Sequence, residues 1–183
     1  MKKCLAVLLS LCFVFSLIGC KGDKTAKEDS SSAPEVIGMP NPMVSSSKAD
    51  MEKKLGFYMG EPKDAQNIKY FIYNKNLGEM QFEFGSVKMN ARIKSETKFT
   101  DISGMYYTFE DEGDATVGTA AVGTREAKLY QHKGENETVQ VLLWYDVVPG
   151  IMYSLSAVSK NLDGFDITAI ANEVYIPMQT EVG

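Results

Sequence analysis

The chain has 183 residues, with 19 Lys and Arg against 24 Asp and Glu, and a formal net charge of −5. This length suits one domain, and the acidic balance argues against a nucleic-acid groove, which needs cationic side chains facing the phosphates. All three Cys precede residue 21 and there is a single His. Disulfides, Cys-ligated metals and His-rich zinc sites are therefore excluded from the rest of the chain, and no cofactor is expected.

Residues 1–19 have the pattern of a secretory signal peptide, in which Lys2 and Lys3 precede an apolar run. As a helix this run would be about 21 Å long, shorter than the roughly 30 Å hydrocarbon core of a bilayer. It ends in Leu17-Ile18-Gly19-Cys20, which resembles the lipobox of bacterial lipoproteins, where the Cys is diacylated and becomes the new N-terminus. Two acyl chains suffice for stable anchoring. We therefore predict Cys20 as a lipid anchor on the outer face of the cell membrane; the alternative is an ordinary secretory signal with a chance Cys.

Residues 20–42 are predicted to form a disordered tether behind this anchor. The segment is rich in Ser, Lys and Pro and has few large apolar residues. Its 22 residues after Cys20 would have a root-mean-square span of about 25 Å. Cleavage would remove two Lys, leaving 17 cationic residues against 24 carboxylates and a net charge of −7. Residues 43–183 are predicted to form a single globular domain.

A short helix is predicted at each end of this domain. The first begins at Ser46 or Ser47, whose hydroxyl can cap it, and ends at Gly56, which tolerates the left-handed conformation. The second is capped by Asp163 and continues to about Tyr175. Its apolar residues recur at helical spacing: Ile167, Ile170, Ala171 and Val174.

Eight strand-like runs separated by turn sequences lie between the helices. They are residues 68–73, 80–84, 87–93, 105–109, 116–122, 127–131, 138–145 and 151–158. Their succession predicts an antiparallel meander. The expected fold is α+β: a curved, mainly antiparallel sheet of about seven or eight strands, with a short N-terminal helix and a C-terminal helix packed on one face.

Two of these runs have apolar residues on both faces. In residues 138–145, Leu142 and Trp144 lie opposite the side that carries Val141, and in residues 68–73, Phe71 and Tyr73 lie opposite Ile68, Tyr70 and Ile72. The helices can cover only one side. We therefore predict a second apolar patch of Phe71, Tyr73, Leu142 and Trp144, which serves either as a second small core under loops or as a ligand or partner surface.

Three local segments contain residues that could carry chemistry, but a structural role explains each of them better. Asp101-Ile102-Ser103-Gly104 lacks a nucleophile elbow and is better explained as a turn. Glu110-Asp111-Glu112-Gly113-Asp114 departs from the alternating ligand pattern of a calcium loop and is better explained as a solvated hairpin tip. His132, as a lone imidazole, is expected to be an exposed hairpin residue.

Several motifs resemble a family of lipid-anchored or membrane-tethered extracytoplasmic domains of unknown function in Gram-positive bacteria. They are Asn41-Pro42-Met43-Val44, Glu52-Lys53-Lys54-Leu55-Gly56-Phe57 followed by Pro62, Asp101-Ile102-Ser103-Gly104-Met105-Tyr106, Leu143-Trp144 and Tyr153-Ser154-Leu155. The resemblance covers most of residues 41–176 and implies an α+β domain with a curved antiparallel sheet. It implies no activity, cofactor or catalytic residue. The chain departs from the pattern at Met105, where the resemblance implies an acidic residue.

The favoured hypothesis is a non-catalytic binding, sensing or scaffold module at the cell envelope, anchored to the membrane and taking an envelope protein, peptide or glycan as partner. No catalytic, cofactor-binding or metal residue is assigned. Two alternatives stay open. An envelope enzyme acting on wall material through carboxylates would need two close carboxylates in a cleft. A lipid or hydrophobe carrier would need an enclosed apolar cavity.

Overall fold

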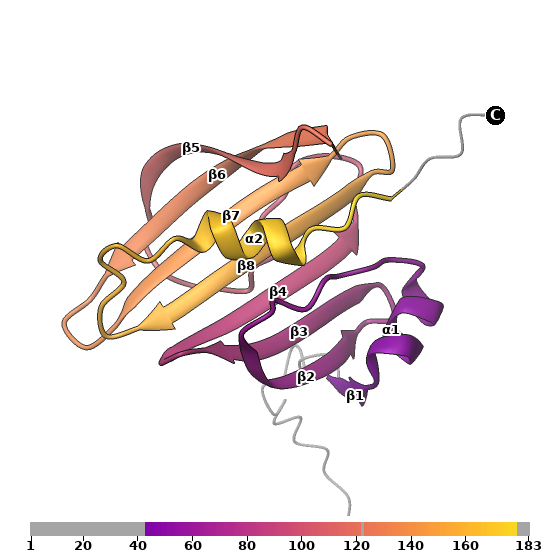
Figure 1. Ribbon diagram of the computed structural model, residues 1–183, viewed down its shortest axis with the longest axis horizontal. Helices are drawn as coiled ribbons and strands as arrows, with labels where there is room; N and C mark the ends of the chain where they lie inside the picture. The colour runs from indigo at the N-terminus through magenta and orange to yellow at the C-terminus, as the bar shows by residue number, and fades with distance from the viewer. Residues whose placement is uncertain (1–42, 122, 179–183) are drawn as a thin grey trace, which may run out of the picture. The chain divides into compact units, whose positions relative to one another are not determined.

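The structure, a computed structural model, describes residues 43–121 and 123–178 (Figure 1). The predicted signal peptide, Cys20 and the predicted tether lie outside the described residues. Within the described part, neither helix has the length and apolar character needed to cross a membrane.

Eight strands form one antiparallel sheet. In chain order they are β1 (Val44–Ser46), β2 (Ala65–Tyr73), β3 (Leu77–Phe84), β4 (Val87–Ser95), β5 (Glu110–Thr119), β6 (Gly123–Lys133), β7 (Thr138–Asp146) and β8 (Ile151–Ser159). Their spatial order is β1-β2-β3-β4-β8-β7-β6-β5. With two helices, this mostly β arrangement is consistent with the predicted α+β class, and the predicted antiparallel sheet is confirmed.

The sheet is not the single meander that the sequence predicts. Strands β1 to β4 form one meander and β5 to β8 another, and the two join where β4 pairs with β8. Residues 96–109, which connect the halves, are a long loop, so the strand predicted at 105–109 is wrong. This loop packs through Ile102, Met105 and Phe109 against one face of the sheet, so its apolar residues reflect burial without strand pairing. The predicted hairpin tip at 110–114 belongs instead to β5.

In the sequence the two helices flank strands β2 to β8, and β1 precedes the first helix. Helix α1 (Lys48–Leu55) begins after Ser47, whose hydroxyl accepts a hydrogen bond from the Asp50 amide at 3.1 Å, and ends at Gly56 with φ +72°. Helix α2 (Ile167–Val174) is capped by Asp166, three residues beyond the predicted Asp163. Gly164, with φ +73°, turns the chain between Asp163 and the helix, which explains the later start.

The two faces of the sheet carry different cores. We call the face with Trp144 and Leu155 the helix face, because α2 lies across β7 and β8 there (Figure 1) and its four buried apolar residues join the main core. The opposite face, the loop face, has a smaller core where the 96–109 loop covers it: Ile102, Val139, Val141, Leu143 and Met152. Beyond that cover, the loop face over β3 and β4 is polar, while β2 carries Phe71 and Tyr73 on this face.

Candidate functional site: a polar network and hollow on the loop face

The four residues of the predicted apolar patch do not lie together. Leu142 pairs with Leu155 and Trp144 with Tyr153 on the helix face, where both are fully buried. Phe71 lies opposite Glu79 on the loop face and is half-buried, as is Tyr73. Within each strand, the predicted alternation of side chains between the two faces is correct. Whether a given side of β7 faces the same way as a given side of β2 depends on the pairing of β4 with β8. A single patch of these four residues is therefore a wrong prediction.

Trp144 is a core residue. Its ring stacks on that of Tyr153 with centroids 5.1 Å apart and meets Tyr175 edge-on at 6.3 Å. Aromatic pairs in these geometries add stability beyond the area they bury. Trp144 is sealed by the protein's own side chains and offers no surface to a ligand.

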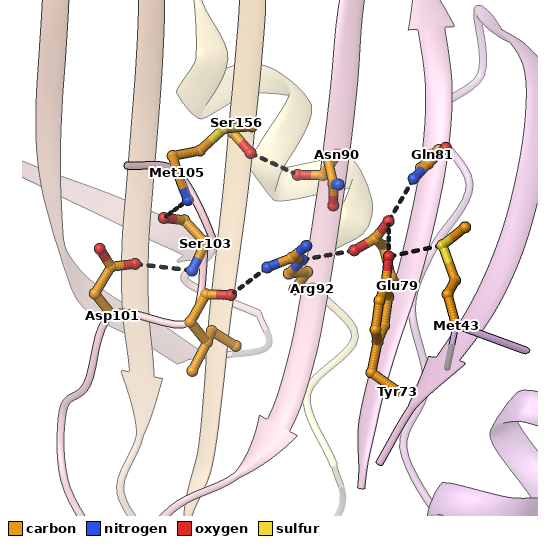
Figure 2. Close-up of polar contacts among 11 residues, drawn as sticks. Met43, Tyr73, Glu79, Gln81, Asn90, Arg92, Asp101, Ser103, Met105 and Ser156 are labelled. Carbon is orange, nitrogen blue, oxygen red and sulfur yellow. Dashed lines mark hydrogen bonds and ion pairs between the residues drawn. The ribbon is translucent and has the colours of Figure 1, made fainter. Parts of the chain in front are cut away.

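The centre of the loop face is a buried ion pair between adjacent strands (Figure 2). Glu79 of β3 has 0% exposed side chain, and its Oε2 lies 2.6 Å from Nε of Arg92 of β4. The other carboxylate oxygen accepts a hydrogen bond from Gln81 and lies 3.2 Å from the Tyr73 hydroxyl. Arg92 also lies over the Tyr73 ring at 5.5 Å. A buried carboxylate is stable only with such partners.

The protonated form of Tyr73 suits this arrangement. Burial, followed by the negative charge of Glu79, raises the pKa of the Tyr73 hydroxyl above its ordinary value. The hydroxyl therefore remains protonated at neutral pH and can donate. Its oxygen also lies 2.8 Å from the Met43 sulfur, which brings the start of the described chain to the network (Figure 2).

Arg92 fastens the long loop to the sheet. Its Nη1 donates to the Ile102 carbonyl at 3.2 Å. The Asp101 carboxylate accepts from the Ser103 amide at 2.8 Å, and the Ser103 hydroxyl accepts from the Met105 amide at 3.2 Å. Gly104 has φ +66° and passes so close that a Cβ there would lie 1.9 Å from Arg92 Nη1. The turn predicted for this segment is confirmed.

A surface hollow of about 330 Å³ lies beside this network. Its polar lining consists of amide, lysine and carboxylate side chains, and Met105 and Val158 supply apolar contact. The polar residues are Asn67, Lys69, Gln81, Glu83, Lys88 and Asn90. Three of them, Asn67, Lys69 and Lys88, are exposed, so the hollow opens to solvent.

Two features shape the hollow for hydrogen bonding. Asn67 has φ +54° at an irregularity in the pairing of β2 with β3, and its amide donates to Glu83 at 2.7 Å. Such bulges re-aim a side chain at a sheet edge. Asn90 Oδ1 is buried and accepts no hydrogen bond from the described residues. Buried acceptors are normally satisfied, so this oxygen retains an unused hydrogen-bonding capacity behind the lining of the hollow.

A second deeply buried carboxylate lies on the helix face. Asp146 is held by Arg125 Nε at 2.9 Å and accepts from the Tyr175 hydroxyl at 2.8 Å. Burial, assisted by this hydrogen bond, raises the pKa of Tyr175 well above its ordinary value. Asp146 and Glu79 thus lie on opposite faces, and each is neutralised by fixed donors.

The lone His and the possible metal ligands do not form a second site among the described residues. Nδ1 of His132 lies 3.0 Å from the Thr108 carbonyl and its ring is 4.9 Å from that of Tyr107, so the loop half-buries it, against the predicted exposed position. Across residues 43–121 and 123–178, no three His, Cys, Asp or Glu side chains are grouped so that they could hold a metal ion.

Comparison with protein-family models, with curated proteins and with solved structures finds no match for this chain. The site is therefore interpreted from its own geometry. Sequence reasoning missed Glu79, Arg92 and Asn90. A signal for them existed, because the two-residue turn Gly85-Ser86 sets the register of β3 against β4 and so places Glu79 opposite Arg92.

Proposed function

We propose that the protein is a bacterial lipoprotein, held on the outer face of the cell membrane by a diacylated Cys20, whose domain binds a polar envelope ligand without turning it over. The lipobox-like Leu17-Ile18-Gly19-Cys20 and the apolar run before it support the anchor. We also propose membership of the family of tethered extracytoplasmic domains that the sequence motifs resemble. The finer fold proposal, with both helices on one face of a curved sheet, is supported by Met51 of α1 and Ile170 of α2, which join one core.

The observation that carries the binding role is the hollow beside the Glu79–Arg92 pair. Amide side chains of Asn67, Gln81 and Asn90 can exchange hydrogen bonds with hydroxyl and amide groups, and Lys69 and Lys88 can pair with carboxylates. Sugar hydroxyls, N-acetyl amides and peptide carboxylates occur together in wall glycan with its peptide stems. A glycan or peptide segment of this kind is therefore the ligand class we propose.

The arrangement of carboxylates favours binding over hydrolysis. A carboxylate mechanism needs two groups flanking one bond, about 5 to 10 Å apart. Glu79 and Asp146 are separated by the sheet and committed to Arg92 and Arg125. Glu83 at the hollow is bonded to Asn67.

The polar lining also favours a glycan or peptide over a lipid cargo. A carrier encloses its hydrophobic ligand in an apolar cavity. The hollow is open at Lys69 and Lys88 instead, and the space between α2 and the sheet is filled by side chains of the main core.

The anchor is tested by intact-mass measurement of the protein purified from a bacterial host that processes lipoproteins. We expect a mature N-terminus at Cys20 carrying acyl chains, and partition of the protein into the detergent phase. Cys20→Ala should abolish both. A mature N-terminus elsewhere, or an unmodified Cys20, would show that the anchor is wrong.

The binding role is tested by titrating the full chain with soluble fragments of wall glycan carrying peptide stems. Lys69→Ala combined with Lys88→Ala is expected to weaken binding about tenfold or more, because hydrogen bonds to charged groups contribute about 1.5 to 3 kcal/mol each. Lys133→Ala, an exposed lysine that does not line the hollow, is the matched control and should bind like the wild type. Equal affinity in the double variant, or cleavage of the fragments by the purified protein, would contradict the proposal.

A further inference from the structure

One end of the sheet gathers exposed apolar residues. It contains the turn between β2 and β3, the turn between β7 and β8, and the start of β1; we call it the anchor end. At the β7–β8 turn, Val147 is 73% and Val148 79% exposed. Phe99 of the long loop is 43% exposed and lines a surface hollow together with Val147. Two adjacent valines at a hairpin apex expose apolar surface that a purely structural turn does not need.

This end is held in shape by hydrogen bonds. The Glu96 amide donates to the Gly150 carbonyl at 2.9 Å, and the Tyr145 hydroxyl donates to the Glu96 carbonyl at 3.0 Å. The start of the loop that carries Phe99 is therefore fixed beside the β7–β8 turn. Phe99 and Val147 line one hollow there, and Val148 is the next exposed residue of the turn.

The described part of the chain begins at the same end. Val44 of β1 pairs with Ile72, close to the end of β2, and β1 runs antiparallel to β2. Met43 therefore lies near the anchor end, beside Tyr73, with the Met43 sulfur at the Tyr73 hydroxyl. The 22 residues between Cys20 and Met43, with the composition of a tether, would span about 25 Å. A lipid anchor at Cys20 would therefore keep the anchor end within about that distance of the bilayer surface.

Charge distinguishes the two ends of the sheet. At the anchor end we compare the turns and the start of the long loop, residues 74–76, 96–99 and 147–150. These segments contain one carboxylate, Glu96, which pairs with Lys94. Their cations are Lys75 and Lys98. At the opposite end the exposed carboxylates include Asp64, Glu110, Asp111, Glu112, Glu135 and Asp163. The lysines there are Lys63, Lys88, Lys133 and Lys160. An anionic bilayer surface attracts cations and repels carboxylates, so it favours the anchor end.

From these observations we infer a second binding surface: Val147, Val148 and Phe99 insert into the headgroup region of the bilayer that holds Cys20, so that the domain stands on the membrane by its anchor end. The inference rests on the proposed lipid anchor. Apolar side chains of interfacial segments lie about 5 to 10 Å into the boundary between headgroups and acyl chains, a depth that a hairpin apex can reach. The hollow on the loop face, whose Lys88 lies near the β3–β4 turn at the opposite end, is then held away from the membrane.

The test uses the full acylated chain in vesicles of phosphatidylglycerol and phosphatidylcholine. Because the only other Cys left after processing is the acylated Cys20, a single introduced thiol can be labelled with an environment-sensitive fluorophore. Val148→Cys reports the anchor end, and Ser86→Cys, in the exposed β3–β4 turn at the opposite end, is the matched control. Spin-labelled lipids serve as depth-dependent quenchers, while flotation and intact mass report anchoring.

We expect lipid quenching at position 148 to be at least about twofold stronger than at position 86, because only the former lies at the headgroup boundary. Equal quenching at the two positions, or none, in protein that floats with the vesicles would overturn this inference and leave the anchor intact. A label at 148 that is shielded from water but not quenched by lipid would identify a protein partner or a second copy there, which also overturns it. A chain that neither floats nor carries acyl groups would overturn the anchor and this inference together.

Discussion

Replacing Arg92 by Met is expected to lower the free energy of unfolding by about 3 to 5 kcal/mol, because it leaves the Glu79 carboxylate buried without its counter-charge. Glu79 has no exposed side-chain area, so water cannot replace the lost guanidinium. The same substitution removes the hydrogen bond to the Ile102 carbonyl, which fastens the long loop. Urea unfolding followed by circular dichroism measures the change.

The control is the double variant with Glu79→Leu and Arg92→Met. Replacing a buried ion pair by apolar residues of similar volume is often close to neutral. We therefore expect the double variant to recover most of the stability that the single variant loses. A single variant as stable as the wild type, or a double variant less stable than the single one, would contradict the role assigned to this pair.

Trp144→Ala is expected to cost about 3 to 5 kcal/mol of stability, the usual loss for a large aromatic side chain removed from a core. The indole is fully buried between Tyr153 and Tyr175, and the cavity it leaves would lie under α2. Since Trp144 is the only Trp in the chain, unfolding is followed by circular dichroism in place of intrinsic fluorescence.

Tyr106→Ala is the matched control for this variant. Tyr106 is 97% exposed, and substitutions of exposed residues usually change stability by less than about 0.5 kcal/mol.

The Trp144→Ala variant should also bind like the wild type. At temperatures where this variant remains folded, the affinity of the variant for wall fragments should equal that of the wild type, because the indole is on the face opposite the hollow. Wild-type stability combined with weakened binding would mean that Trp144 contacts ligand after all.

The sequence predicts features that depend on near neighbours along the chain. Turn residues such as Gly85 and Ser86 mark a hairpin, and the alternation of Met80 and Phe82 with Gln81 distinguishes the two faces of β3. These local signals identified the antiparallel sheet. The Asp101 turn was found in the same way, because its hydrogen bond spans only two residues.

Features that depend on distant partners were not predictable from the pattern. The sequence does not specify that β4 pairs with β8, and that pairing decides that Trp144 shares a face with Ile72 while Tyr73 lies on the other face. The run from Met105 to Phe109 has the alternation of a strand, yet it covers a sheet and pairs with nothing. The candidate site combines residues of β2, β3, β4, β8 and the long loop, so it becomes visible only once the sheet is assembled.

The pairing of β4 with β8 also has a consequence during folding. Strands β1 to β4 pair with one another locally, whereas the partner of β4 on its other side, β8, lies far along the chain, as the pairing of Ala91 with Leu155 illustrates. Until β8 pairs, β4 is an open edge, which invites pairing with other chains. Its outward residues on one face are Lys88, Asn90, Arg92 and Lys94, and cationic and polar side chains on an edge discourage such pairing. Lys88 and Asn90, which line the hollow, and Arg92, which binds Glu79, thus also have the character that disfavours edge pairing while β8 is not yet in place.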